Sequence, residues 1–227
     1  MRHLIYIFLL TIFSSCQESD HQIIEPELKE FNNHLGHDKA AVLNKAVNSF
    51  ENFLKNNFPD QDEQQERLLR FLQLISNDEW PNPNWKLQTE ANKEILEEFE
   101  TSGLRKEFRL YGYEEDPNRI EEEIIPITHS GKPNNEPSID SVGYFRALGL
   151  FRISLAESST KDSLIMKYVG ARRIGNLPYE NLAEGLLANN ISYSNPIHKR
   201  IMIIDFYYDL MKWDVERKNK KRHANNK

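Results

Sequence analysis

The chain has very little cysteine and, after its first residues, no long apolar run. Cys16 is the only cysteine among 227 residues, so disulfide bonds within the chain are excluded. Exported proteins of this size are often rich in paired cysteines, and this one is not. No apolar stretch after residue 16 approaches the roughly 20 residues that a transmembrane helix needs. We therefore expect the body of the chain to be soluble.

Motifs that identify common enzyme classes are also missing. The sequence has no GxSxG elbow, no glycine-rich phosphate loop, no HExxH pair and no dinucleotide fingerprint. The acidic runs at 114–116 and 121–123 lack the alternating oxygen ligands and central glycine of a calcium loop. A net charge of −6 argues against nucleic acid as the main partner. We therefore expect no cofactor and no metal, and the sequence does not favour an enzyme.

The first sixteen residues have the pattern of an export signal. Arg2 is followed by ten uncharged residues, 4–13, then by Ser14, Ser15 and Cys16. Ten helical residues span about 15 Å, which is too short to cross a bilayer and suits a signal-peptide core. This order resembles the lipobox of bacterial lipoproteins. The resemblance implies cleavage before Cys16, whose thiol receives a diacylglycerol, and a lipid-anchored place in the cell envelope.

One position departs from the usual lipobox. Phe13 stands three residues before the cysteine, where leucine is usual. Two other interpretations stay open, namely an ordinary secretory signal with an incidental cysteine and a buried start to a cytosolic helix. The acidic residues after Cys16 resemble signals that send lipoproteins to the outer surface, and a plain polar tether explains them equally well. The membrane face is therefore left open between the periplasmic and the surface side of the outer membrane.

The rest of the chain predicts four regions after the signal at 1–15. Composition and the presence of Pro26 and Gly36 suggest a flexible tether over 16–37. Residues 38–218 predict one compact all-α domain of about seven helices, and 219–227 predict a basic disordered tail. In the first helix, at about 38–58, Leu43, Val47, Phe50 and Leu54 recur at three and four residues.

Two parts of the domain carry weaker or different signals. Residues 104–128 suggest a small β-hairpin or an ordered loop around Asp116 and Pro117. From Ser138 to Leu155 the apolar residues return to a helical period, which predicts a helix there. Asn195 followed by Pro196 predicts the start of a long, mostly buried last helix.

The polar residues of that last helix form the first candidate site. At 100° per residue, His198, Asp205 and Asp209 fall near one line along the helix. One interpretation is a groove in which an imidazole and two carboxylates carry out acid–base chemistry. The other, which the sequence favours, is the single solvated face of a packed helix.

Two further residue pairs could bind a ligand. Arg172 and Arg173 could hold a phosphate or carboxylate, or simply interact with a helix dipole. Trp80 and Trp85 flank a proline-rich loop and could form a platform for a sugar ring, or anchor that loop to the core. For both pairs the sequence favours the second role, interaction with a helix dipole for the arginines and anchoring of the loop for the tryptophans.

Together these features predict a membrane-anchored envelope lipoprotein that acts through protein–protein contact. It would be an accessory or scaffold subunit, or an immunity protein against a toxin. The alternatives are an envelope enzyme that uses the polar face of the last helix and a glycan- or small-ligand-binding lipoprotein that uses the two tryptophans.

Overall fold

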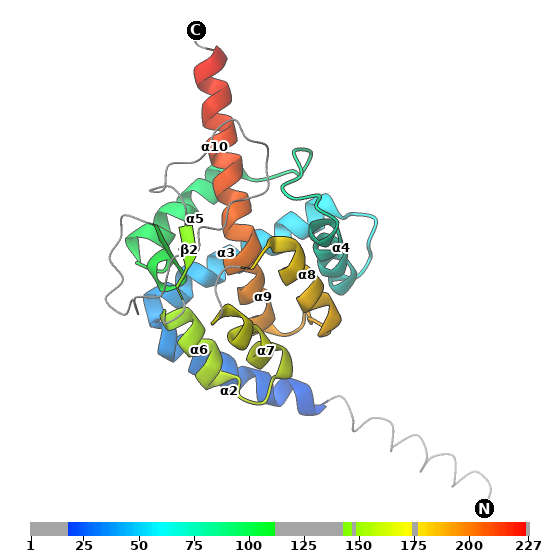
Figure 1. Cartoon of the computed structure of the whole chain (residues 1–227), viewed down its shortest axis with the longest axis vertical. Coiled ribbons are helices and arrows are strands. Elements are labelled where there is room, and N and C mark those ends of the chain that lie inside the picture. The colour runs from blue at the N-terminus through cyan, green and yellow to red at the C-terminus, as the bar shows by residue number, and fades with distance from the viewer. Residues whose placement is uncertain (1–17, 112–142, 147–148, 174–176, 226–227) are drawn as a thin grey trace, which may run out of the picture.

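The C-terminal segment passes through the middle of the molecule and the other helices surround it. The structure, a computed structural model, describes residues 18–111, 143–146, 149–173 and 177–225. The central segment consists of α9 (Pro196–Met202), the π-helical turn η3 (Ile203–Tyr207) and α10 (Tyr208–Asn225). Figure 1 shows these three in line, with α10 rising out of the body toward the C-terminus. Almost every side chain from Ile197 to Met211 is buried, as the sequence predicted for this helix.

The all-α prediction is confirmed. The surrounding helices are α2 (Glu18–Leu35), α3 (His37–Asn57), α4 (Gln64–Ser76), α5 (Thr89–Thr101), α6 (Leu150–Ser158), α7 (Ser163–Arg172) and α8 (Tyr179–Ala188). The predicted stripe of α3 faces inward, because Leu43, Val47, Phe50 and Leu54 are all buried. Within the described residues, no helix combines the length and the apolar character that crossing a bilayer requires.

An aromatic cluster forms the centre of the core. The ring of Phe71 from α4 lies 5.5 Å from the rings of Phe50 and Phe53 and 5.5 Å from that of Trp85. Tyr207 of η3 contacts Phe50 from the other side, at 5.3 Å. Edge-on and tilted ring pairs of this kind add to the free energy gained by burying their area. The cluster fixes α3, α4 and η3 to one another.

The flexible tether predicted over 16–37 is wrong for residues 18–35, which form α2. Phe31 and Leu35 are fully buried, and the Phe31 ring meets Phe151 of α6 edge-on at 5.8 Å. Leu28, Phe31 and Leu35 lie on one face of the helix and pack against the core. Pro26 lies inside α2 and does not end it. The helix ends at Leu35, and the next residue, Gly36, has a φ of 95°, which glycine adopts without strain.

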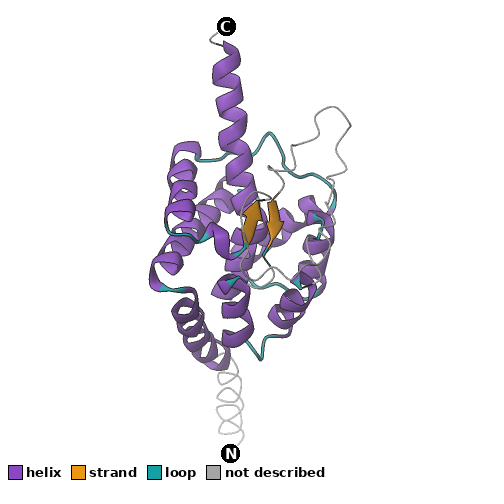
Figure 2. Ribbon diagram, turned by 60° about the vertical axis from the view of Figure 1, so that its left-hand side comes forward, coloured by secondary structure: helices purple, strands orange, loops and turns teal. Residues whose placement is uncertain are grey.

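The helix predicted from Ser138 to Leu155 is also wrong in its first part. Residues Gly143–Phe145 form a strand, β2, which pairs antiparallel with β1 (Arg109–Tyr111), and α6 begins only at Leu150. The hairpin expected within 104–128 therefore has one strand there and its partner at 143–145; residues 112–142 lie outside the described part. Figure 2 shows the two short strands side by side against the helices. Their pairing joins segments far apart in sequence, so local periodicity could not reveal it.

The start of α6 is packed very closely against η1 (Arg105–Glu107). A Cβ atom on Gly149 would lie 1.8 Å from the backbone carbonyl oxygen of Glu107, so only glycine fits. The Glu107 side chain accepts a hydrogen bond from the amide of Leu150 at 3.0 Å. It also forms an ion pair with Lys39 at 2.6 Å. Glu107 thus ties α3, η1 and α6 together.

The disordered basic tail predicted over 219–227 is wrong for residues 219–225, because α10 continues to Asn225; residues 226–227 lie outside the described part of the chain. Arg217 donates to the carbonyl of Pro83 at 2.9 Å, and Lys218 lies 3.6 Å from the buried carboxylate of Asp214. Arg222 pairs with Glu90 of α5 at 3.3 Å. Arg222 thus joins the end of α10 to α5, and Arg217 joins it to the loop before α5.

Candidate functional site

The polar residues of the central helix form neither a groove nor a solvated face. Asp205 is 1 % exposed and pairs with Arg172, whereas Asp209 pairs with Arg109 and accepts a hydrogen bond from the Tyr179 hydroxyl at 2.6 Å. Both sequence interpretations of this face are therefore wrong. The charged partners come from α7 and β1, and the hydroxyl of Tyr179 comes from α8, which the spacing along α9–α10 could not show.

His198 has a separate environment. Its Nε2 atom lies 2.9 Å from a carboxylate oxygen of Asp162, at the start of α7. The π-helical turn η3 lies between His198 and Asp209 and adds one residue to a turn, which upsets the 100° phase assumed along this helix. The structure thus divides the three predicted residues among three different partners.

Arg172 and Arg173 do not form an anion-binding fork. Arg172 is 5 % exposed, while the side chain of Arg173 is exposed. Burial alone lowers the pKa of Arg172, but the charge of Asp205 outweighs this and raises it. Arg172 is therefore a permanently charged partner of Asp205 in the core.

The two tryptophans anchor their loop to the core. Trp85 is 8 % exposed, and its ring meets that of Phe53 edge-on at 5.5 Å. Trp80 is half-buried and lies 5.5 Å from Tyr179 and 6.1 Å from Phe206. A flat, exposed pair of rings for a sugar is absent at these two residues. The structural alternative from the sequence is confirmed.

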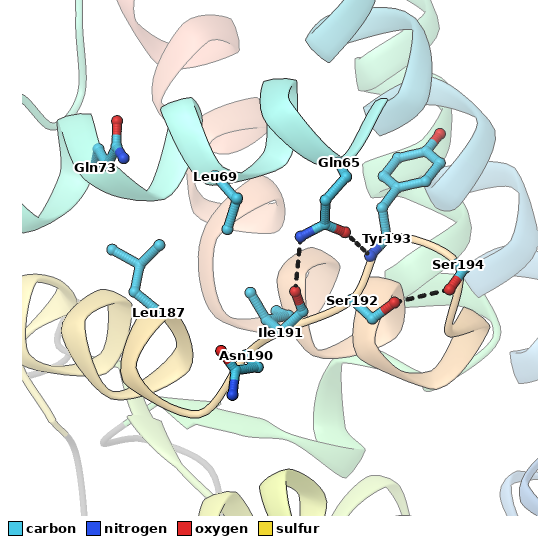
Figure 3. Close-up of a pocket in the computed structure, with 9 residues that line it drawn as sticks. All are labelled: Gln65, Leu69, Gln73, Leu187, Asn190, Ile191, Ser192, Tyr193 and Ser194. Carbon is cyan, nitrogen blue, oxygen red and sulfur yellow. Dashed lines mark hydrogen bonds between the residues drawn. The ribbon is translucent and has the colours of Figure 1, made fainter. Parts of the chain in front are cut away.

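In the described part of the chain a groove lies between α4, α8 and the loop that follows α8. Its volume is about 720 Å³, within the range of ligand pockets in proteins. Figure 3 shows Leu69 of α4 and Leu187 of α8 pointing toward one another across it. The lining residues carry no charge; they are Gln65, Leu69, Gln73, Leu187, Asn190, Ile191, Ser192, Tyr193 and Ser194.

Gln65 fixes one wall of the groove. Its side-chain Nε2 donates to the carbonyl of Ile191 at 2.9 Å, and its Oε1 accepts from the backbone amide of Tyr193 at 2.6 Å (Figure 3). One side-chain amide thus satisfies two backbone groups of the 190–194 loop. The hydroxyls of Ser192 and Ser194 bond to one another at 2.8 Å. The loop is therefore held in one conformation beside α4.

A buried polar junction supports the same loop from behind. His198 Nδ1 accepts a hydrogen bond from the backbone amide of Ser192 at 3.0 Å. Asp162 accepts from the amides of Leu164 and Ile165 as the N-cap of α7, at 2.9 and 3.1 Å. Burial alone raises the pKa of Asp162, but the hydrogen bonds from His198 and these two amides outweigh it and lower the pKa below its ordinary value. Asp162 is thus a carboxylate in this junction.

Metal binding has no support in the described part of the chain, where no three His, Cys, Asp or Glu side chains come together as ligands would. His34, near the start, pairs with Glu157 of α6 at 3.2 Å instead. Cys16 and its predicted lipid lie outside the described residues.

Sequence reasoning missed the groove residues. Gln65, Gln73 and Asn190 are uncharged and belong to no motif, and they come from two segments that are far apart in the sequence. Asn195 and Pro196 predicted the start of the last helix, but they said nothing about α4. The groove exists because α4 packs along α8, which no local pattern specifies.

Comparisons of the chain with protein-family models, with curated proteins and with solved structures found no match.

Proposed function

We propose that this chain is an envelope lipoprotein that is anchored through a lipid on Cys16 and binds a partner protein in the groove between α4 and α8. The neutral, amphipathic lining of this groove is the observation that carries the proposal. Leu69 and Leu187 offer an apolar contact, while the amides of Gln73 and Asn190 both donate and accept hydrogen bonds. An extended peptide segment presents the same combination of apolar side chains and backbone amides.

Exposure of the groove favours a segment of a large partner over a small ligand. The side chains of Gln73, Asn190 and Ser194 are all exposed, so the groove is open on one side. A small ligand would stay partly uncovered there, whereas ligand pockets usually enclose most of their ligand. A partner protein would cover the open side with its own surface. An accessory subunit and an immunity protein both fit this mode of binding.

The position of α2 supports an anchor close to the body. α2 begins at Glu18, two residues after Cys16, and packs into the core through Phe31 and Leu35. A lipid on Cys16 would therefore hold the helical body near the bilayer instead of on a long tether. Figures 1 and 2 show that α2 begins at the pole opposite to the end of α10. The basic residues of α10 would then face away from the anchoring membrane.

The enzyme alternative finds no supporting geometry among the predicted residues. Asp205, Asp209 and His198 each bind a different partner, and those partners are Arg172, Arg109 and Asp162. We propose binding as the role of the chain for this reason.

The anchor is tested with Cys16→Ser in the expressing bacterium. We expect the wild-type chain in the membrane fraction and the variant in the soluble fraction. A variant that stays with membranes and keeps its full N-terminus would contradict the anchor.

The groove is tested with Leu69→Glu, which places a charge in its apolar part. The tagged full chain is purified from membranes in mild detergent, and co-purifying proteins are identified by mass spectrometry. Met166→Glu is the control, because Met166 of α7 is 43 % exposed and does not line the groove. We expect a stoichiometric partner with wild type and Met166→Glu and its loss with Leu69→Glu, with unchanged circular dichroism. Equal capture by both variants would exclude the groove as the binding site.

A further inference from the structure

The hydrogen bond between His198 and Ser192 requires one protonation state of the imidazole. A backbone N–H can only donate, so Nδ1 of His198, 3.0 Å away, must accept and carries no proton. In the neutral ring the proton is then on Nε2, which donates to Asp162 Oδ2 at 2.9 Å. The neutral ring thus joins the 190–194 loop to the start of α7.

A second proton would change this arrangement at one atom only. It would place an N–H on Nδ1 opposite the N–H of Ser192, and two donors cannot form a hydrogen bond. The bond from Nε2 to Asp162 would persist and gain strength, because both groups would then be charged. Protonation therefore keeps the ring in place and releases the amide of Ser192.

The charged groups nearest to this junction lie at the start of α7 and on α2. Asp162 is the acid in direct contact with the ring. Glu27 of α2 and Lys161 lie near the same junction: burial and the charge of Asp162 raise the pKa of Glu27, and the charge of Lys161 lowers it. His198 is 5 % exposed, so bulk water screens its interaction with Asp162 little.

The basic residues Lys199 and Arg200, which follow His198 in α9, bind partners on α3. Lys199 pairs with Glu51 of α3 at 2.7 Å, and Arg200 donates to Asn44 of the same helix. The hydrogen-bond partners of His198 come instead from Asp162 and from the loop.

We propose that protonation of His198 releases the 190–194 loop and weakens partner binding in the groove. Ser192 and Tyr193, two residues of the released segment, line the groove directly. Gln65 holds Ile191 and Tyr193 on either side of Ser192, so the loop loses one of its fixed points and keeps the others. This inference rests on the proposed role of the groove.

The loop response is measured without any partner, by hydrogen exchange of the full chain in detergent micelles at pH 7.5 and pH 5.0. Rates are corrected for the intrinsic effect of pH on exchange. We expect protection of the Ser192 amide to fall roughly five- to tenfold at pH 5.0, which is the loss expected for one hydrogen bond. Amides in the middle of α3 serve as the internal control. Unchanged protection at Ser192 would overturn the inference.

Two variants assign the response to His198. In His198→Asn the side-chain oxygen can accept from Ser192 and does not titrate, so we expect protection that is equal at both pH values. Asp162→Asn keeps Oδ1 as the cap of α7 and places an NH2 group opposite Nε2 of His198, so Nε2 must accept and the ring proton moves to Nδ1, opposite the amide of Ser192. We therefore expect low protection of Ser192 at both pH values in this variant. A full pH response in His198→Asn, or wild-type protection of Ser192 at pH 7.5 in Asp162→Asn, would contradict the mechanism.

Partner binding at the two pH values separates this inference from the proposed function. If Leu69→Glu leaves capture intact, the groove is not the binding site, whatever the loop does. If capture depends on Leu69 but is equal at pH 5.0 and pH 7.5, the groove binds the partner and the pH control is wrong. We expect weaker capture at pH 5.0 for wild type and equal capture at both pH values for His198→Asn.

Discussion

Asp162 and Asn195, the N-caps of α7 and α9, are hydrogen-bonded to each other. Asn195 Nδ2 donates to Asp162 Oδ2 at 3.2 Å, while each side chain uses its Oδ1 atom to cap its own helix. The starts of two helices 33 residues apart are thus joined through their capping side chains. His198 completes the junction and connects it to the groove.

This relationship predicts that the two caps are energetically coupled. Loss of one cap costs roughly 1 kcal/mol. We expect Asn195→Ala to lower the free energy of unfolding by about that amount, and Asp162→Ala by about 2 kcal/mol because it also loses the bond to His198. The double variant should cost less than the two together, by roughly 0.5 kcal/mol or more. Urea unfolding followed by circular dichroism measures all three, and strictly additive costs would contradict the coupling.

The same junction predicts a dependence of stability on pH. The folded chain lowers the pKa of Asp162, so its carboxylate stabilises the fold above the ordinary aspartate pKa of about 3.9. That stabilisation is lost as the pH falls through the lower folded value. The gap in unfolding free energy between wild type and Asp162→Asn should therefore be full at pH 7 and shrink below about pH 4. Exposed Asp60 provides the control substitution, Asp60→Asn.

The buried pair of Arg172 and Asp205 predicts a non-additive effect of another kind. Arg172→Met leaves the carboxylate of Asp205 buried without its charged partner, and such a loss costs about 3–5 kcal/mol. Replacing both residues, as Arg172→Met with Asp205→Leu, removes the unpaired charge as well. We expect the double variant to be more stable than Arg172→Met alone, as measured by urea unfolding. A double variant less stable than both single ones would show that the charges themselves hold the fold.

The two hydrogen bonds from Gln65 to the 190–194 loop predict that substitutions of Gln65 loosen the loop to different degrees. Gln65→Ala removes both hydrogen bonds to the 190–194 loop. Gln65→Glu keeps an acceptor for the Tyr193 amide but places a second oxygen opposite the carbonyl oxygen of Ile191, and the two acceptors repel each other. Protection of Tyr193 against hydrogen exchange should fall roughly five- to tenfold in Gln65→Ala and by a smaller factor in Gln65→Glu. Equal loss in both variants would mean that the acceptor does not hold the loop.

Two glycines predict opposite effects of the same substitution. Gly149→Ala places a Cβ atom against the Glu107 carbonyl and should destabilise the chain by at least about 2 kcal/mol. Gly170 lies inside α7 with open space where its Cβ would be, so Gly170→Ala should stabilise by about 0.5–1 kcal/mol. Thermal unfolding of the two variants checks both signs.

Interactions within single elements were predictable from the sequence. The stripe of Leu43, Val47, Phe50 and Leu54 gave α3 and its buried face, because side chains three and four residues apart share one side of a helix. Asn195 caps α9 and Pro196 takes its first position, as predicted. The resemblance at Cys16 likewise depends on consecutive residues, and the anchor it implies stays a prediction.

Interactions between distant elements were decided by the tertiary structure alone. The polar segment around Pro26 forms a packed helix, α2, because Phe31 contacts Phe151 of α6 in the core. The partners of Asp205 and His198 come from α7 and its N-cap, so the phase along α9 could not identify them. The groove likewise needs α4 beside α8. Local patterns identified helices such as α3 and α9, whereas burial of charge and apolar area selects which elements meet, and that selection depends on the whole chain.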